Sequence, residues 1–132
     1  MPSRKKGITE ERLLHKKMIE LWKRGESDYC EVRGSNIHGR GVYATTFIPK
    51  DTRVIEYVGE IIDKRESDRR GASQQKKADT TGDAAVYIFT ISKNYDLDGN
   101  VPWNIARLIN HSCAPNCEAC IVGRRIYIDA IR

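Results

Sequence analysis

The sequence predicts a mostly β protein with short helices, preceded by an N-terminal amphipathic helix. Two observations support this fold class. Residues 10–22 place apolar side chains at helical spacing, whereas from Tyr29 onward the chain changes to short β-branched runs separated by turn residues. The length of 132 residues suits one domain with a modest core.

The first expected element is an amphipathic helix of about sixteen residues. Thr9 is expected to cap it, with Glu10 and Glu11 in the first turn, where negative charge complements the helix dipole. Gly25 supplies the stop. An apolar stripe runs along one face and is expected to pack on the body of the protein or on a partner; it consists of Leu14, Met18, Leu21 and Trp22.

The strands follow from runs rich in β-branched and aromatic residues, which lie at 29–33, 42–46, 53–62, 86–92, 95–97, 118–122 and 126–131. Residues 48–51 and 97–100 have the composition of turns. The stretch 63–82 is polar and lacks apolar periodicity, which predicts a short helix passing into a mobile insertion. Gly71 and residues 80–82 are the expected breakers.

The charge is concentrated at the N-terminus. Residues 1–24 hold eight basic and three acidic side chains, which accounts for the whole net charge of +5. Such a helix either presents a solvated face or makes a weak electrostatic contact with nucleic acid or an acidic protein. No apolar run is long enough to cross a bilayer, and the N-terminus is too charged for a secretory signal, so we expect an intracellular protein.

Two short segments carry the functional information. One is His38-Gly39-Arg40-Gly41-Val42-Tyr43, and the other runs from Arg107 to Cys117 and contains Asn110-His111-Ser112-Cys113. In this order, and joined by strand-like runs, they resemble the SET-domain protein lysine methyltransferases, from about Cys30 to the last residue. The resemblance implies a SET-domain (β-clip-like) fold over residues 28–132, following a basic helical segment at 1–27.

The resemblance also implies the site. His38, Gly39, Arg40 and Gly41 would contact the amino-acid end of S-adenosylmethionine through a closely approaching backbone. Asn110 and His111 would bracket its adenosine portion. A Gly-x-Gly pair can instead be a tight turn, and an Asn-His pair can be satisfied within its own loop.

Tyr87 aligns with the family strand that places an aromatic in the lysine channel beside the cofactor methyl, so we expect it to serve both catalysis and cofactor binding. Phe89 shares its face of the strand, and the alternative for both is an ordinary core aromatic. Tyr57, within Tyr57-Val58-Gly59-Glu60, is expected to be scaffold, with Gly59 allowing a close backbone approach.

The cysteines point to free thiols, because three of the four crowd positions 113–120 and no fourth ligand for a closed zinc site is evident. We expect no metal, except at Cys113 if a cysteine segment after the SET core is supplied. The resemblance further implies an acidic-Leu-(Thr/Ser)-x-(Asp/Glu)-Tyr segment with a catalytic tyrosine beyond Arg132, so the domain is expected to be incomplete at its C-terminus.

The expected function is methyl transfer from S-adenosylmethionine to the ε-amine of a lysine in a protein substrate, with histones as one possible class. The alternative is a non-catalytic SET-like module that binds cofactor or peptide. The expected location is the nucleus in a eukaryote and the cytoplasm in a bacterium.

Overall fold

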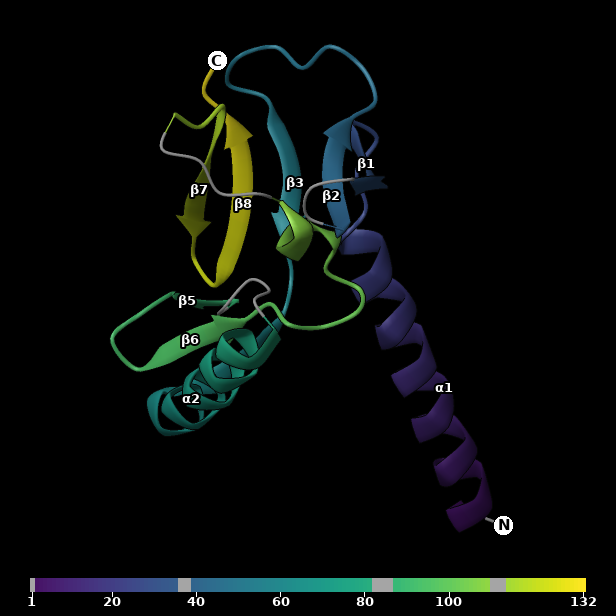
Figure 1. The fold of residues 1–132 in the computed structure, drawn as a ribbon. Helices are drawn as coiled ribbons and strands as arrows, with labels where there is room; N and C mark the ends of the chain where they lie inside the picture. The colour runs from purple at the N-terminus through teal and green to yellow at the C-terminus, as the bar shows by residue number, and fades with distance from the viewer. Residues whose placement is uncertain (1, 36–38, 82–86, 110–113) are drawn as a thin grey trace.

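The computed structural model describes the backbone of residues 2–35, 39–81, 87–109 and 114–132. Figure 1 shows the order of its elements. They are α1 (Pro2–Arg24), β1 (Cys30–Ser35), β2 (Gly39–Ala44), β3 (Arg53–Tyr57), β4 (Glu60–Asp63), α2 (Lys64–Thr81), β5 (Ile88–Thr90), β6 (Tyr95–Asp98), the 3-10 helix η1 (Ile105–Leu108), β7 (Cys117–Val122) and β8 (Arg125–Ala130).

The strands form three small antiparallel sheets, in the orders β1-β2, β3-β8-β7 and β4-β6-β5. Helix α2 lies along the third sheet, in contact with β4 and β6, while η1 packs against β2 and β3 (Figure 1). The mostly β fold class predicted from the sequence is therefore confirmed. None of the described helices is long and apolar enough to cross a membrane.

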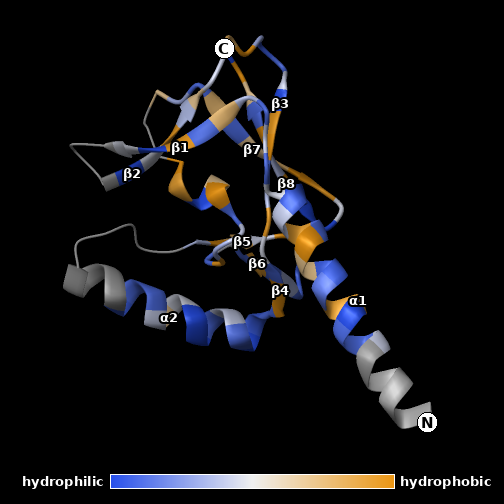
Figure 2. Ribbon diagram, turned by 90° about the vertical axis from the view of Figure 1, so that its right-hand side faces the viewer, coloured by the Kyte–Doolittle hydropathy of each residue, from blue (hydrophilic) through white to orange (hydrophobic). Residues whose placement is uncertain are grey.

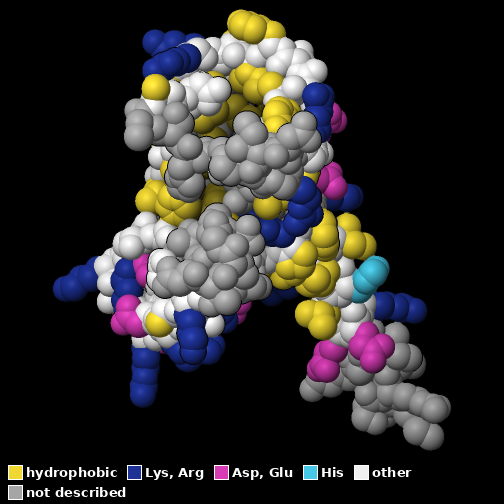
Figure 3. All heavy atoms as spheres, in the orientation of Figure 1, with side chains coloured by type: hydrophobic (Ala, Val, Ile, Leu, Met, Phe, Trp, Pro, Cys, Tyr) yellow, Lys and Arg dark blue, Asp and Glu magenta, His cyan; other side chains and the backbone are white. Residues whose placement is uncertain are grey.

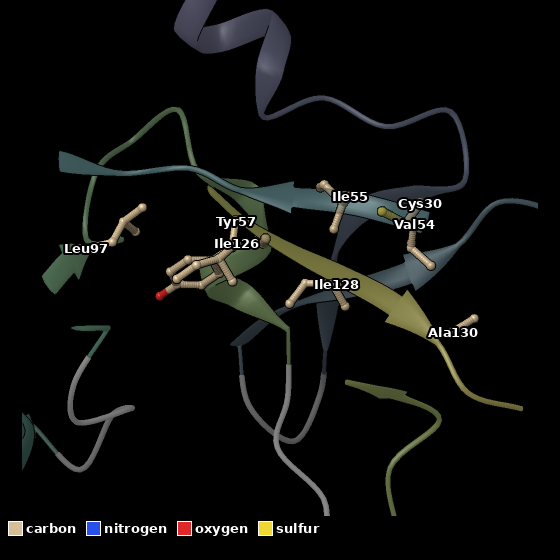
Figure 4. Packing of buried hydrophobic residues seen from close by; sticks show 9 residues of the cluster. Cys30, Val54, Ile55, Tyr57, Leu97, Ile126, Ile128 and Ala130 are labelled. Atoms are coloured by element: carbon tan, nitrogen blue, oxygen red, sulfur yellow. The ribbon is translucent and has the colours of Figure 1, made fainter. Parts of the chain in front are cut away.

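The core is shared between sheets. Ile126 of β8 is fully buried, and Tyr57 of β3 and Leu97 of β6 belong to the same cluster (Figure 4). Along β8 the buried residues alternate with more exposed ones, as expected for a strand with one face on the core. The cluster therefore holds the β3-β8-β7 sheet against the β4-β6-β5 sheet.

Helix α1 is longer than predicted. It begins at Pro2, and Thr9 lies inside it, so the predicted cap was wrong. Proline is favoured at the first helical position, and the lysine and arginine residues after it are good helix formers, so the sequence before Thr9 is compatible with helix. The end at Arg24 agrees with the predicted stop at Gly25, whose N–H donates to the carbonyl of Leu21 at 3.2 Å.

The apolar stripe of α1 packs on the body only at its C-terminal end. The Trp22 ring lies 6.5 Å from that of Trp103, whereas Leu14 is 65% exposed. Arg24 donates two hydrogen bonds to the buried carboxylate of Glu56, and so fastens the end of the helix to β3. Figure 3 shows the hydrophobic side chains of α1 on the surface next to the body.

Helix α2 continues through Gly71, so the predicted break there was wrong. Asp63 begins the helix, because its Oδ1 accepts the N–H of Glu66 at 2.8 Å. Side-chain bonds from Arg70 and Gln74 to Asp98 hold the helix on both sides of the glycine. These contacts outweigh the cost of about 1 kcal/mol for glycine in a helix.

The run 53–62, predicted as one strand, is two strands in different sheets. The break falls at Val58 and Gly59. A Cβ on Gly59 would lie 2.2 Å from the carbonyl oxygen of Asp98, so the backbones approach as closely there as the sequence predicted.

Candidate functional site

The Gly-x-Gly segment forms the start of β2. Gly41 is buried and pairs with Arg33 of β1, whereas the Arg40 side chain is exposed. The backbone of Gly39 belongs to the same strand, and His38 lies outside the described residues. We call the residues predicted to hold the cofactor, 38–41 and 110–111, the cofactor cradle. The part of it that the structure describes is a strand with a buried glycine.

The 3-10 helix η1 brings the second motif toward the first. It packs against β2, and after it the backbone of Ile109 is extended, with φ −68° and ψ 129°. Asn110 and His111 follow directly, and both lie outside the described residues, as do Ser112 and Cys113. Strand β2 of the first motif and the helix that leads into the second therefore lie side by side.

Asn104 fixes the start of η1 and is fully buried. Its Nδ2 donates to the carbonyl of Gly99 at 2.9 Å, and its Oδ1 accepts the N–H of Val58 at 3.2 Å. One side chain thereby satisfies two buried backbone groups that belong to neither a helix nor a strand ladder. Asn104 joins the β3–β4 junction, the end of β6 and η1.

Tyr87 lies one residue before β5, with a half-buried side chain. Its backbone is held from two directions. The N–H donates to Oε1 of Gln74 at 3.0 Å, and the carbonyl accepts both the Oη–H of Tyr57 at 2.8 Å and the N–H of Gly99 at 2.9 Å. No other candidate site residue that the structure describes is held by so many tertiary hydrogen bonds.

Tyr57 and Phe89 form an edge-to-face pair with ring centroids 4.8 Å apart. Tyr57 is buried, and burial, followed by the nearby Asp98 carboxylate, raises the pKa of its phenol. The phenol therefore stays protonated and donates to the Tyr87 carbonyl. Phe89 packs against the core, which favours the plain aromatic interpretation for that residue.

Two acidic side chains of β6 accept hydrogen bonds from polar side chains of α2. Asp98 is buried and accepts from Arg70, Gln74 and the N–H of Asn100. Asp96 accepts from Lys64 and Ser67. Burial acts to raise the pKa of Asp96, but these hydrogen bonds hold it below its usual value.

The cysteines that can be placed lie in strands. Cys117 begins β7 against the core, and burial raises the pKa of its thiol. Cys113 lies outside the described residues. Among residues whose side chains the structure describes, no three His, Cys, Asp or Glu side chains come together as a metal site.

Sequence reasoning missed Asn104, Gln74 and Asp98. Asn104 offered a signal, since it is an amide residue directly before an apolar helical turn and three residues before the second motif. Gln74 offered none, because it stands in a polar run where every neighbour is also polar.

Comparison with known proteins identifies a family whose pattern covers most of this chain. The model of the family described as SET domain matches residues 39–132. The chain belongs to the SET-domain family. The match includes Gly41, Tyr87 and Asn104, and the segment from Asn110 to His111.

Several relatives of this SET-domain chain are named as enzymes. It is 40% identical over 109 residues to "Histone-lysine N-methyltransferase trithorax" of Drosophila virilis, covering 80% of this chain and 3% of that protein. It is 44% identical over 101 residues to "Histone-lysine N-methyltransferase, H3 lysine-4 specific" of Schizosaccharomyces pombe, covering 72% of this chain and 10% of that protein. The chain thus spans a small part of the relatives it matches.

Proposed function

We propose that this chain binds S-adenosylmethionine and takes part in transfer of its methyl group to the ε-amine of a lysine in a protein, with histone tails as the substrate class. Support comes from membership of the SET-domain family and from relatives named histone-lysine N-methyltransferases. The observation that carries the proposal is the packing of β2, with its buried Gly41, beside η1, which leads into Asn110 and His111.

The residues present suit this chemistry. A glycine in β2 allows another group to approach the backbone closely, and the Asn-His pair offers donors and acceptors for an adenine ring. S-adenosylmethionine supplies a methyl group on a positively charged sulfonium. Because a free lysine has a pKa of about 10.4, the protein must hold the amine unprotonated in a site that excludes water.

Tyr87 is the residue that we assign to the amine. Its phenol can accept from or donate to the amine, and the face of its ring favours the positive charge that surrounds the reacting methyl. Methyl transfer requires the reacting atoms to be closely aligned. A backbone held in place at Tyr87 helps to keep its phenol in a fixed position beside the amine.

Calorimetry of S-adenosylmethionine binding tests the cradle. Gly41→Ala and Asn110→Ala should each weaken binding by about 10-fold, the equivalent of roughly 1.4 kcal/mol. Gly34→Ala is the matched control, because nothing lies within 4 Å of a Cβ there. If both variants fold by circular dichroism and bind like the parent, the cradle is elsewhere.

Methyl transfer to a histone H3 tail peptide separates the enzyme from the non-catalytic module. The assay uses this chain lengthened by the family's acidic-Leu-Thr-x-Asp-Tyr segment, alongside the same chain with that tyrosine changed to phenylalanine. Transfer that depends on the tyrosine and falls in Tyr87→Phe supports the enzyme. Binding of cofactor or peptide with no transfer by the lengthened chain favours the module.

We further propose that residues 1–27 act apart from a SET domain at 28–132, as a basic segment in weak contact with nucleic acid or an acidic protein. The supporting observation is that Arg12, Lys16 and Lys23 are exposed and follow helical spacing along one face of α1. For a histone-modifying protein of a eukaryote, the nucleus is the corresponding location.

A further inference from the structure

Gln74 bridges helix α2 to the site. Its Oε1 accepts the backbone N–H of Tyr87 at 3.0 Å, and its Nε2 donates to Oδ1 of Asp98 at 3.1 Å. Both ends of the amide are used, so the side chain cannot rotate without losing a bond to β6 or to the segment entering β5.

The Asp98 end of this bridge is firmly placed. Asp98 lies on the central strand of its sheet, opposite Glu60 of β4 and Ile88 of β5. Arg70 donates to Asp98 at 3.2 Å and to Glu60 at 2.8 Å, so one guanidinium joins α2 to two strands. Figure 2 shows α2 as hydrophilic along most of its length, in agreement with docking through polar contacts.

The Tyr87 end is equally constrained from the opposite side. Tyr57 and Gly99 both donate to the Tyr87 carbonyl, and these two donors belong to the body of the fold and not to α2. Among the residues whose side chains the structure describes, Gln74 is therefore the α2 residue that binds the Tyr87 backbone.

We propose that Gln74 is a positioning residue for Tyr87: by binding its N–H, Gln74 makes the direction of the Tyr87 side chain depend on the docking of α2. The inference rests on the proposed function for its consequence, since Tyr87 is the residue assigned to the substrate amine. The coupling at the amide is a property of this fold and can be measured without turnover.

The first measurement is hydrogen exchange of the Tyr87 amide, read by NMR in the 132-residue chain. Gln74→Leu removes both bonds, and loss of one hydrogen bond worth about 1 to 1.5 kcal/mol should speed exchange by roughly 10-fold. Ser73→Ala is the control, because Ser73 is exposed and next along the same helix. Unchanged protection of Tyr87 in folded Gln74→Leu would overturn the inference.

Gln74→Glu supplies a conservative rescue. The groups facing position 74 are Asp98 on β6, Arg70 on α2 and, through Arg70, Glu60 on β4. When ionised, the introduced carboxylate keeps an acceptor for Tyr87 but repels Asp98, whereas in its protonated form it can donate as glutamine does. Repulsion from Asp98 should move the ionised side chain away from the Tyr87 amide and lower its protection. Protection should therefore recover as the pH is lowered toward the ordinary glutamate pKa of about 4.3, with the parent measured over the same range.

The functional readout is the affinity for a lysine-containing H3 tail peptide in the presence of S-adenosylhomocysteine. Gln74→Leu should weaken the peptide several-fold and leave cofactor affinity near that of the parent. Faster exchange at Tyr87 with unchanged peptide affinity would show a merely structural bond and sink the positioning role. If the parent binds neither ligand, the proposed function fails while the exchange result still decides the coupling.

Discussion

At the scale of single residues, the backbone at Tyr87 depends on one close contact between Gly99 and the ring of Tyr57. A Cβ placed on Gly99 would lie 2.2 Å from Cε1 and 2.5 Å from Oη of Tyr57. The absence of a side chain at Gly99 lets the phenol reach the Tyr87 carbonyl, which the Gly99 N–H also binds. The two donors to that carbonyl therefore both depend on a single glycine.

Gly99→Ala should consequently destabilise the protein by about 1 to 3 kcal/mol, the usual cost of forcing a buried ring aside. Urea unfolding followed by tyrosine and tryptophan fluorescence measures the change. Gly34→Ala provides the reference, since its Cβ would meet nothing within 4 Å. Equal stability of the two variants would show that Tyr57 moves freely and does not hold Tyr87.

The residues of the site were predictable from the sequence to the extent that local pattern reveals them. Gly59 was expected to permit a close approach, and its position against Asp98 agrees. Gln74 binds the Tyr87 amide 13 positions away and left no local signal. Asn104 stood in a recognisable position before a helical turn, but its partner Val58, 46 positions away, could not be foreseen. Periodicity in a sequence reveals helices and strands, which are local. It does not reveal which distant backbone group a polar side chain will bind, because tertiary packing decides that.

At the scale of elements, α2 is stabilised by its ion pairs with little help from apolar burial. Hydrogen bonds from Arg69 and Arg70 lower the pKa of Glu66 from its ordinary 4.5 to about 2. A carboxylate whose folded pKa is depressed adds stability at pH values above its unfolded pKa, and this stability disappears as the pH falls through the folded value.

The melting temperature should therefore fall as the pH is lowered from about 4.5 to about 2, and Glu66→Gln should reduce the size of that fall. Because Glu66 is near the surface, added salt should reduce it too. Asp68→Asn, an exposed carboxyl of the same helix, serves for comparison. A Glu66→Gln profile that overlays the parent from neutral to acid pH would contradict this account.

Helix α2 and the run 53–62 show where the prediction of secondary-structure elements fails. Strand positions were predicted to within a few residues, because β-branched runs and turns are local signals. The length of α2 was not predictable, since Arg70, Gln74 and Asp98 carry the helix across Gly71. The split of 53–62 into two strands was also hidden, because continuous apolar character does not reveal a change of sheet.

At the scale of the whole molecule, α1 projects from the body (Figure 1). In the sequence, residues 1–24 carry the surplus of positive charge. Reversing Arg12, Lys16 and Lys23 to Glu should weaken binding to a short DNA duplex and to polyglutamate. For DNA, the slope of log K against log salt should drop by roughly 2 to 3.

The matched variant reverses three exposed basic residues elsewhere, at Lys50, Lys93 and Arg132. Fluorescence anisotropy across a salt series compares the two. If both triple variants lose affinity equally, the attraction belongs to the overall charge and α1 has no part of its own.

The ladder between β3 and β8 has a consequence for the order in which the chain folds. Arg53 and its partner Asp129 are 76 positions apart, whereas β4, α2, β5 and β6 pair entirely within residues 60–98. Closing the longer loop requires more chain entropy, so the compact 60–98 unit can form first. During synthesis, the apolar residues Val54 and Ile55 of β3 lack their β8 partner until β8 has left the ribosome, which leaves this strand open to wrong pairing in the nascent chain.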